Sequence, residues 1–402
     1  MNNRSFFYSQ EPIKMKNTQS IILMFVSFFI CNHGVYSQSQ RELVDTEATK
    51  ETKALYSNLF KIAEQGFMFG HEDTDAYGIG WWADEGTSDV EKISGSYPAV
   101  HGWDLGNIDR EFNIDTVDFE RMKVWMRDTY KRGGINTISW HITNLVSGSH
   151  SWDKTPAVNA ILPGGTHHDA YLKKLNLVAD FLLDLKSGSK YIPIVFRPWH
   201  EHNGDWFWWG KGNASEEDYI ALWRFTVDYL KNERDIHHLI YAFSPDRSRL
   251  NIDSAAEASY LYGYPGDDYV DVLGLDNYWD VGHRSNTKST EEQAKDLVKS
   301  LQLVSRLAKE KDKLPALTET GSAGIANPRW FTEVILNPIK ENQESIDIAW
   351  VLVWRNRFAS DAMAPFPGHP SVDDFKSFKE DAMTIFEDDL KNTYKSNKVT
   401  IK

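Results

Sequence analysis

A segment rich in aromatic and titratable residues follows the apolar run 191–196 of this sequence. Residues 197–210 read Arg-Pro-Trp-His-Glu-His-Asn-Gly-Asp-Trp-Phe-Trp-Trp-Gly, which places one glutamate, Glu201, among two histidines and four tryptophans. Indole faces suit the apolar faces of sugar rings, and an imidazole beside a carboxylate can hold a hydroxyl or tune a proton donor. Glycine and asparagine punctuate the segment, which favours a functional loop over a purely core role for the tryptophans. The pattern predicts a carbohydrate site centred on Glu201.

Glycosidic bond cleavage needs a second carboxyl group, because one acid must protonate the leaving oxygen while another attacks or activates water. Glu319 is the candidate, since it directly follows the apolar run 314–317. A strand that ends in a carboxylate is typical of a residue at the mouth of a barrel rather than on its outer surface. We therefore expect Glu319 to be the partner of Glu201.

The elements that must position these glutamates are eight β-rich runs that alternate with helical patterns. Two pairs that resemble capping boxes, Ser215 with Asp218 and Ser371 with Asp374, precede helical runs. The predicted strands are residues 67–69, 99–103, 135–140, 192–197, 239–244, 272–276, 316–318 and 349–354. This alternation predicts a single (β/α)8 TIM barrel with long loops at its C-terminal face. A doubly wound open sheet is the alternative, but the sequence lacks the Gly-rich phosphate turn that such a sheet ordinarily carries.

In a barrel of eight, the fourth and seventh strands face each other across the open end. Glu201 follows the fourth predicted strand and Glu319 the seventh. Opposite strand ends can supply the separation of about 5 to 5.5 Å that a retaining carboxyl pair requires. Further polar and aromatic groups follow the other predicted strands, namely His71, Glu72, Trp103, Asp104, Trp140, His141, His200, Asp246, Asp276, Tyr278, Trp354 and Arg355.

A metal site is the other chemistry that this region suggests. In the His-Glu-His segment 200–202, alternate side chains of an extended chain would point the same way. A barrel metal site also needs further histidine, lysine or aspartate ligands at later strand ends, which we cannot assemble here. The His-His pairs 167–168 and 237–238 are expected at the surface. We therefore expect no catalytic metal.

Five motifs together resemble glycoside hydrolase family 26. They are Arg-Pro-Trp-His-Glu at 197–201, Trp-Phe-Trp-Trp-Gly at 206–210, Gly-Leu-Asp-Asn-Tyr at 274–278, Thr-Glu-Thr-Gly at 318–321 and Trp-Arg-Asn at 354–356. That family belongs to a clan of retaining glycosidases with catalytic glutamates on barrel strands four and seven, and most members are endo-β-1,4-mannanases. The histidine before the strand-four glutamate, here His200, sets the family apart from its clan relatives. The resemblance extends over residues 69–370.

The resemblance implies a double displacement in which Glu201 is the general acid/base and Glu319 the nucleophile. His200 would orient the acid/base or bind sugar, and Tyr278 would donate a hydrogen bond to the nucleophile. This reaction needs no cofactor.

The same resemblance implies a set of sugar contacts. Trp354 would form the hydrophobic floor under the sugar being cleaved, and Trp206 would stack on its neighbour across the scissile bond. His141 and Arg355 would contact hydroxyls on the non-reducing side. Their residue types leave alternatives open: Trp354 could be core, Arg355 a structural ion pair and His141 a satisfied structural histidine.

Composition limits the class of partner. The 402 residues are 41% hydrophobic and 25% charged, as in ordinary soluble globular proteins, and the net charge is −14. An acidic chain argues against nucleic acid and is compatible with a neutral polysaccharide. We expect a monomer acting on β-mannan. Mixed-linkage β-glucan and β-1,3-xylan are alternative substrates, and a non-catalytic glycan-binding protein would need neither glutamate.

An export signal is predicted over residues 1–37, ahead of a catalytic domain at 38–402. Two lysines precede the apolar run 21–30, and small residues follow it. A run of ten apolar residues is short for a membrane span. Met15 is an alternative start, because the residues before it are unlike a signal.

The sole cysteine, Cys31, lies in this segment, so the domain that follows contains no disulfide. Ile30 precedes Cys31, whereas a small residue usually precedes a lipidated cysteine. We expect a periplasmic or secreted protein without a lipid anchor.

Overall fold

The computed structural model describes residues 41–396 and 398–402. The export signal predicted over residues 1–37, and Cys31 within it, lie outside the described residues. Among the described helices, none has the length and apolar character that a membrane crossing requires.

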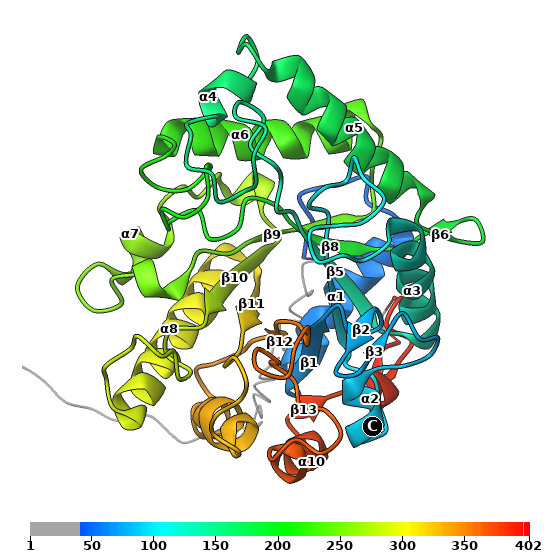
Figure 1. The fold of residues 1–402 in the computed structure, drawn as a ribbon, viewed down its shortest axis with the longest axis vertical. Coiled ribbons are helices and arrows are strands. Elements are labelled where there is room, and N and C mark those ends of the chain that lie inside the picture. Colours follow the sequence, from blue (N-terminus) through cyan, green and yellow to red (C-terminus); the bar gives the residue numbers. More distant parts are fainter. Residues whose placement is uncertain (1–40, 397) are drawn as a thin grey trace, which may run out of the picture. The chain divides into compact units, whose positions relative to one another are not determined.

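Eight parallel strands of the described chain form a closed barrel (Figure 1). They are β1 (Phe67–Glu72), β4 (Val100–Asp104), β5 (Ile135–Ser139), β8 (Ile194–Arg197), β9 (Leu239–Phe243), β10 (Val272–Asn277), β11 (Leu314–Thr320) and β12 (Trp350–Val353). Each pairs with the next, and β12 returns to β1 with Phe69 opposite Val351. The eight predicted strands and the TIM barrel are confirmed, and closure excludes the open doubly wound sheet.

One strand begins later than predicted. Residues 190–191 form β7 (Lys190–Tyr191), which pairs antiparallel with β6 (Lys186–Ser187) in a short hairpin, so β8 begins at Ile194 rather than at residue 192. A further short strand, β13 (Thr384–Ile385), pairs with the start of β1. These details leave the barrel order unchanged.

In the described part of the chain, helical structure follows each barrel strand. In chain order the elements are α2 (Asp89–Ser94), α3 (Phe119–Arg132), α4 (Val158–Ile161), α5 (His168–Asp184), α6 (Glu216–Asp228) continued by a π-helical turn (Tyr229–Glu233), α7 (Ala256–Tyr260), α8 (Thr290–Lys311), a π-helical segment (Trp330–Leu336) that leads into α9 (Asn337–Glu341), and α10 (Val372–Glu380). This strand-then-helix order is the right-handed βα repeat that a parallel barrel requires.

The two predicted helix caps differ in outcome. Ser215 begins α6 by accepting a hydrogen bond from the N–H of Asp218, which is one of the two hydrogen bonds of the predicted capping box. The capping box at Ser371 is wrong, because this side chain makes no cap hydrogen bond. Asp374 instead accepts hydrogen bonds from the backbone N–H groups of 331–332 and so ties α10 to the preceding helical segment.

Successive side chains of each barrel strand point alternately into and out of the barrel, which produces two apolar layers. On β9, Ile240 and Ala242 point into the barrel, where helix α1 (Lys50–Ala63) packs against the same cluster. Tyr241 and Phe243 point outward into the layer beneath the surrounding helices. Burial on both faces explains why the barrel strands are near-continuous apolar runs in the sequence.

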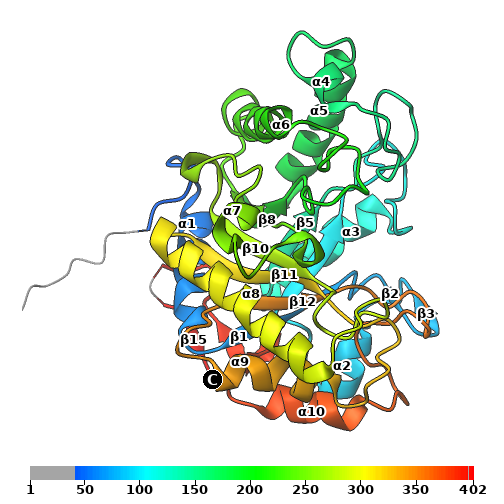
Figure 2. The same ribbon diagram turned by 90° about the vertical axis from the view of Figure 1, so that its left-hand side faces the viewer.

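Helix α1 marks the N-terminal end of the barrel. In Figure 2, α1 and the hairpin formed by β2 (Tyr77–Gly78) and β3 (Trp81–Trp82) lie on opposite sides of the barrel. The hairpin follows β1, so it belongs to the loops at the C-terminal ends of the strands. Those loops form the face on which TIM barrels carry their sites.

Candidate active site

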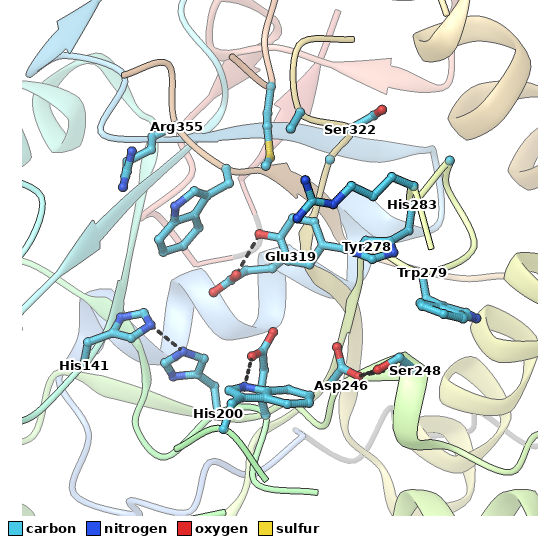
Figure 3. A pocket seen from close by; sticks show the side chains of 18 of the residues that line it. His141, His200, Asp246, Ser248, Tyr278, Trp279, His283, Glu319, Ser322 and Arg355 are labelled. Atoms are coloured by element: carbon cyan, nitrogen blue, oxygen red, sulfur yellow. Dashed lines mark hydrogen bonds between the residues drawn. The ribbon is translucent and has the colours of Figure 1, made fainter. Parts of the chain in front are cut away.

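A cavity of about 940 Å³ lies at the C-terminal face of the barrel (Figure 3). The eight residues predicted for the site all line it, namely His141, His200, Glu201, Trp206, Tyr278, Glu319, Trp354 and Arg355. They follow five different strands, so only barrel closure brings them together.

Glu201 lies on a sharp turn directly after β8. Trp199 and Glu201 both adopt positive φ values, 55° and 52°, which non-glycine residues rarely do. The Glu201 N–H donates to the carbonyl of Ser244 at 2.8 Å, which anchors this backbone to the neighbouring β9 loop. The indole N–H of Trp206 donates to Glu201 Oε2 at 2.7 Å. Such strain is concentrated at functional sites, and here it fixes the carboxyl over the barrel mouth.

Glu319 reaches the cavity through an irregularity in β11. Ala316 faces the barrel interior, so regular alternation would direct Thr318 inward and Glu319 outward. The pairing of β11 with β12 shifts register between Leu317 and Thr320. A β-bulge inserts one residue and re-aims the side chain that follows, and Glu319 accordingly lines the cavity.

The buried Arg197 side chain, at the end of β8, joins the acidic groups of the site. Its guanidinium donates to Asp276 Oδ2 at 2.8 Å, to Ser244 Oγ at 3.0 Å and to Glu319 Oε1. The Tyr278 hydroxyl donates to the other oxygen of Glu319 at 2.8 Å. Both oxygens of Glu319 therefore accept hydrogen bonds, one of them from a cation, which stabilises the ionised carboxylate and fixes its orientation.

The surroundings of Glu201 favour its protonated form. Burial raises its pKa well above the ordinary value, and the negative charges of Asp246, Asp276 and Glu319 raise it further. The hydrogen bond from Trp206 opposes this shift without cancelling it. The site thus combines a glutamate whose protonated form is favoured with a second glutamate whose two oxygens both accept hydrogen bonds, and acid-assisted nucleophilic substitution uses such a pair.

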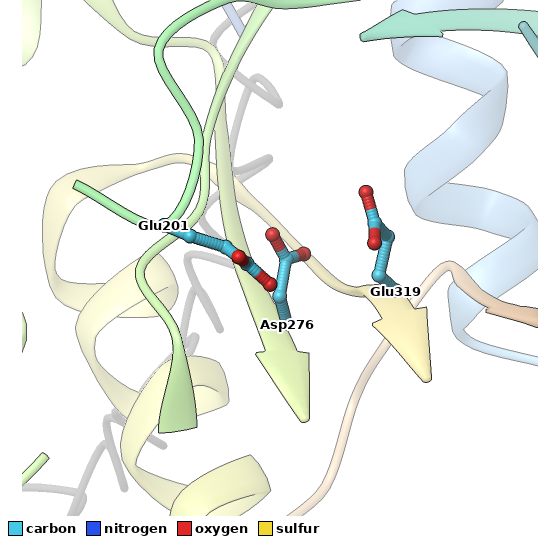
Figure 4. Close-up of side chains that lie close together, drawn as sticks. All are labelled: Glu201, Asp276 and Glu319. Carbon is cyan, nitrogen blue, oxygen red and sulfur yellow. The ribbon is translucent and has the colours of Figure 1, made fainter. Parts of the chain in front are cut away.

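The side chains of Glu201, Asp276 and Glu319 lie close together (Figure 4), and Glu201 and Glu319 also line the cavity. One carboxylate oxygen from each lies within 4.8 Å of those of the other two. Carboxyl pairs in retaining glycosidases are about 5 to 5.5 Å apart, and those in inverting enzymes about 6.5 to 9.5 Å. The spacing of Glu201 and Glu319 therefore fits direct attack on the sugar. A metal ion could also lie among three such acids, but Arg197 already compensates two of them.

Two imidazoles with opposite protonation preferences lie beside the glutamates. Burial opposes protonation of His141, but the Asp104 carboxylate, 2.8 Å from His141 Nδ1, outweighs it and raises the pKa. Burial lowers the pKa of His200 well below its ordinary value, and the positive Arg197 lowers it further. The two Nε2 atoms are 3.3 Å apart. His141 is therefore the donor and neutral His200 the acceptor, which fixes both rings against the cavity wall.

The tryptophans of the 199–209 segment have two different roles. Trp199, Trp208 and Trp209 are fully buried, so the functional role that the loop pattern favoured over a core role is wrong for these three. Each of these three indole N–H groups donates to a buried acceptor: a threonine hydroxyl for Trp199 and backbone carbonyls for the other two. The loop therefore folds into its own small core, and of its tryptophans only Trp206 lines the cavity.

Trp354 and Arg355 lie at the end of β12. Trp354 is partly exposed and lines the cavity, so it is not a core residue. Arg355 also lines the cavity, and its Nε lies 2.8 Å from Asp115 Oδ1. Arg355 is thus both a partner in an ion pair and a cavity residue, because Asp115 lines the same cavity.

His202 is directed away from the catalytic pair. Its Nε2 lies 2.6 Å from the carbonyl oxygen of Tyr262, and its ring stacks on Tyr219 at 4.3 Å. Burial lowers the pKa of His202 to about 4, so the neutral ring donates to that carbonyl. Because His200 and His202 have different partners, the His-Glu-His segment does not present a common face to a metal.

The surface prediction for the histidine pairs is wrong at His238. Its side chain is 1% exposed, its Nε2 lies 3.1 Å from the Leu182 carbonyl, and its ring stacks on Tyr191. His237 is partly exposed, as are the residues at 167–168. His238 therefore helps to hold α5 against the start of β9.

Several cavity residues were not predicted from the sequence. Trp152, which is 45% exposed, stacks 5.3 Å from the His141 ring. Trp279 and His283 pack 5.2 Å apart in the loop after β10. Figure 3 shows His141 on one side of Glu319 and the pair of Trp279 and His283 on the other. The only sequence signal for these residues is an aromatic in a polar loop, which does not specify a partner.

Three comparisons with known proteins bear on this site. A family model described as glycosyl hydrolase family 26 matches residues 44–346. A mannan endo-1,4-β-mannosidase from Bifidobacterium adolescentis is 32% identical in an alignment of length 362 that covers 84% of this chain and 34% of that protein. A mannan endo-1,4-β-mannosidase from Bacillus subtilis is 33% identical in an alignment of length 214 that covers 49% of this chain and 55% of that protein. The chain therefore matches about a third and about half of the lengths of these curated relatives.

Among solved structures, a GH26 β-mannanase from Bacteroides ovatus superposes with a TM-score of 0.80 at 40% sequence identity. The match covers 87% of this chain and 98% of that structure. The likeness thus includes the barrel and its loops together.

Proposed function

Because the chain belongs to glycosyl hydrolase family 26, we propose that it is a retaining, endo-acting β-1,4-mannanase that hydrolyses mannan, galactomannan or glucomannan. The observation that carries this proposal is the approach of Glu201 and Glu319, whose nearest carboxylate oxygens lie within 4.8 Å at the base of an open cavity. The names of the relatives in Bifidobacterium, Bacillus and Bacteroides support mannan as the substrate.

In the first step, ionised Glu319 attacks the anomeric carbon of the bound sugar. The bond from that carbon to the leaving oxygen breaks, and the oxygen takes the proton of Glu201 as it departs. The hydrogen bonds from Arg197 and Tyr278 hold the attacking carboxylate in one orientation. The product of this step is a covalent glycosyl ester on Glu319.

In the second step, Glu201, now ionised, removes a proton from water. The resulting hydroxide attacks the same carbon and releases Glu319 as a carboxylate. Two inversions give net retention. The proton taken from water restores the protonated form of Glu201, so the cycle closes without a cofactor.

Aromatic and polar residues around the pair position the sugar rings. Trp354 lies under the sugar being cleaved, and Trp206 stacks on the sugar across the scissile bond. Because the Trp206 indole N–H donates to Glu201, the residue that receives the leaving sugar also orients the acid. His141 and Arg355 contact hydroxyls on the non-reducing side, and His200 orients the acid/base or binds sugar.

Endo action follows from the extent of the cavity on both sides of the catalytic pair. Arg355 and His141 lie on one side, and Trp279 and His283 on the other (Figure 3). A polysaccharide can therefore continue past the scissile bond in both directions. A cavity closed on one side would release a fixed short product.

The test is the product profile on galactomannan, glucomannan, lichenan and β-1,3-xylan, with the anomeric configuration of the first product followed by NMR. We expect mixed β-manno-oligosaccharides from the mannans, formed first as the β-anomer. Release of sugars only from lichenan or xylan would replace mannan as the substrate, and an initial α-anomer would contradict the retaining mechanism. No hydrolysis of any of these would favour a glycan-binding protein.

Export and a monomeric state complete the proposal. The signal-like segment 1–37 supports export to the periplasm or the medium. Cell fractionation with N-terminal sequencing would test this, and a cytoplasmic protein that retains residues 1–37 would contradict it. Sedimentation of the purified protein would test the monomer.

A further inference from the structure

A second hollow lies beside the catalytic cavity, and we refer to it as the aromatic groove. Its volume is about 310 Å³, and its lining consists of Ala76, Trp82, Ala83, Phe112, Thr116, Val117, Asp118, Arg121 and Trp125. Trp82 is 50% exposed and Phe112 is 44% exposed, so both rings are accessible to solvent. Large exposed aromatics that gather in one hollow mark an interaction site.

Neighbouring rings hold two aromatic rings of the groove, Trp82 and Trp125, in place. Trp82 belongs to the β2–β3 hairpin and stacks on its cross-strand partner Tyr77 with ring centroids 4.8 Å apart and planes 9° apart. The Tyr77 hydroxyl donates to Asp73 at 2.6 Å, which fixes the lower ring. Trp125 lies parallel to the buried Trp103 at 6.1 Å. A fixed platform binds a flat ligand face at a low cost in side-chain entropy.

Polar groups and strained backbone border these rings. The Arg121 guanidinium donates to the Ala83 carbonyl at 3.1 Å, and the Asp118 side chain accepts the backbone N–H of Arg121. Thr116 and Ala83 adopt φ values of 68° and 54°, which for a β-branched residue such as Thr116 is an outlier. Backbone strain of this kind is concentrated at ligand clamps. A carboxylate and a guanidinium beside aromatic faces are the groups that recognise the hydroxyls and the apolar face of a sugar.

The groove and the catalytic cavity share one wall. Ile114 and Asp115 line the cavity, whereas the next two residues, Thr116 and Val117, line the groove. Asp115 also pairs with Arg355, which the proposed function assigns to the non-reducing side of the site. A chain that leaves the cavity on that side therefore meets the groove across a single loop.

We propose that the aromatic groove binds a distal, non-reducing stretch of the same β-1,4-linked mannan chain whose cleavage the catalytic cavity performs. This inference rests on the proposed function. The groove contributes affinity only for substrates long enough to extend from the cavity over the loop at 112–118. It thereby makes the enzyme prefer polymer over short oligosaccharides.

The test compares the Trp82→Ala/Phe112→Ala double variant with the wild type on polymeric linear mannan and on mannotetraose. Stacking contributions of the size seen for aromatic pairs predict a fall of about tenfold in kcat/KM on polymer. The value on mannotetraose should not change. Phe358→Ala is the matched control, because Phe358 is 60% exposed and is absent from the residues that line either hollow. This control should match the wild type on both substrates.

Binding is measured separately by affinity electrophoresis in mannan gels, with Glu319→Gln to prevent hydrolysis. Retardation should weaken when Trp82→Ala and Phe112→Ala are added to that background. Unchanged retardation and an unchanged polymer-to-oligosaccharide ratio would overturn the inference, as would equal losses on both substrates. A wild-type dimer that the double variant converts to monomer would instead identify the groove as a contact between copies. If the wild type cleaves no mannan, the proposed function fails. If the wild type is active and the double variant behaves as the wild type does, only the inference about the groove fails.

Discussion

The replacement Arg197→Met gives the sharpest test of the electrostatic design of the site. Arg197 is 3% exposed and pairs with Asp276 and Glu319, both of which are buried. Methionine fills a similar volume but leaves two carboxyl groups without their cation. Removing one partner of a buried ion pair costs about 3 to 5 kcal/mol. The substitution should also abolish activity, because the guanidinium orients the nucleophile.

The magnitude translates into a measurable change in melting temperature. An unfolding entropy of about 2.1 cal/mol/K per residue over roughly 360 described residues gives about 0.76 kcal/mol/K. A loss of about 3 to 5 kcal/mol at this entropy lowers Tm by about 4 to 7 °C.

The loss of stability in Arg197→Met should depend on pH, and the direction of this dependence can be predicted. Burial raises the pKa of Asp276 well above its ordinary value, and Arg197 is the main group that opposes this rise. Without the arginine, the folded variant binds a proton that the unfolded chain has already released above pH about 4. When a group has a higher pKa in the folded state than in the unfolded chain, the folded state loses stability as the pH increases. The Tm deficit of the variant should therefore be larger at pH 8 than at pH 5.

Differential scanning calorimetry of the wild type and Arg197→Met at both pH values is the assay. Arg306→Met is the matched control, because Arg306 also pairs with two acids, Glu257 and Glu310, but is 47% exposed. An exposed pair contributes about 0 to 1 kcal/mol, so this variant should melt within about 1 °C of the wild type. Equal small shifts in both variants, or a deficit at Arg197 that does not grow with pH, would refute the reasoning.

Three further outcomes concern the catalytic pair. Glu319→Ala should abolish mannan hydrolysis while leaving the far-UV circular dichroism close to wild type; undiminished activity would remove the nucleophile assignment. Glu201→Gln should reduce kcat on mannan by about 10² to 10⁴, the usual contribution of general acid catalysis, with a smaller loss on aryl glycosides whose leaving groups need no proton; equal losses on both would contradict the acid role. The basic limb of the kcat/KM profile should move to lower pH in Asp246→Asn, because Asp246 raises the pKa of Glu201, and to higher pH in Trp206→Phe, because the indole hydrogen bond lowers it. Shifts in the same direction would show that Glu201 does not control that limb.

The barrel was predictable because its strands are buried on both faces. Runs such as 239–243 and 272–275 are apolar at nearly every position, and this pattern survives without any knowledge of partners. The catalytic glutamates were predictable for a related reason, since Glu201 and Glu319 each interrupt such a pattern at a strand end. The cap at Ser371 was not, because Asp374 bonds to a segment that is distant in the sequence.

Other features depend on tertiary contacts that a sequence pattern does not encode. Arg197 and Glu319 are 122 residues apart, so their ion pair has no local signature. The pattern around Glu201 favoured a functional role for all of its tryptophans alike, and only the folded loop separates Trp206 from the buried Trp208. His202 likewise depends on a carbonyl 60 residues away.

The bulge in β11 has a consequence for protein engineering. A regular β11 would pair more evenly with its neighbours, and idealised strands generally stabilise a fold. Deleting one residue there to restore strict alternation would turn Glu319 toward the helices, since a slip of one position exchanges the two faces of a strand. Regularising β11 to stabilise the barrel would therefore abolish activity. Stabilising substitutions can instead be made in the surface helices.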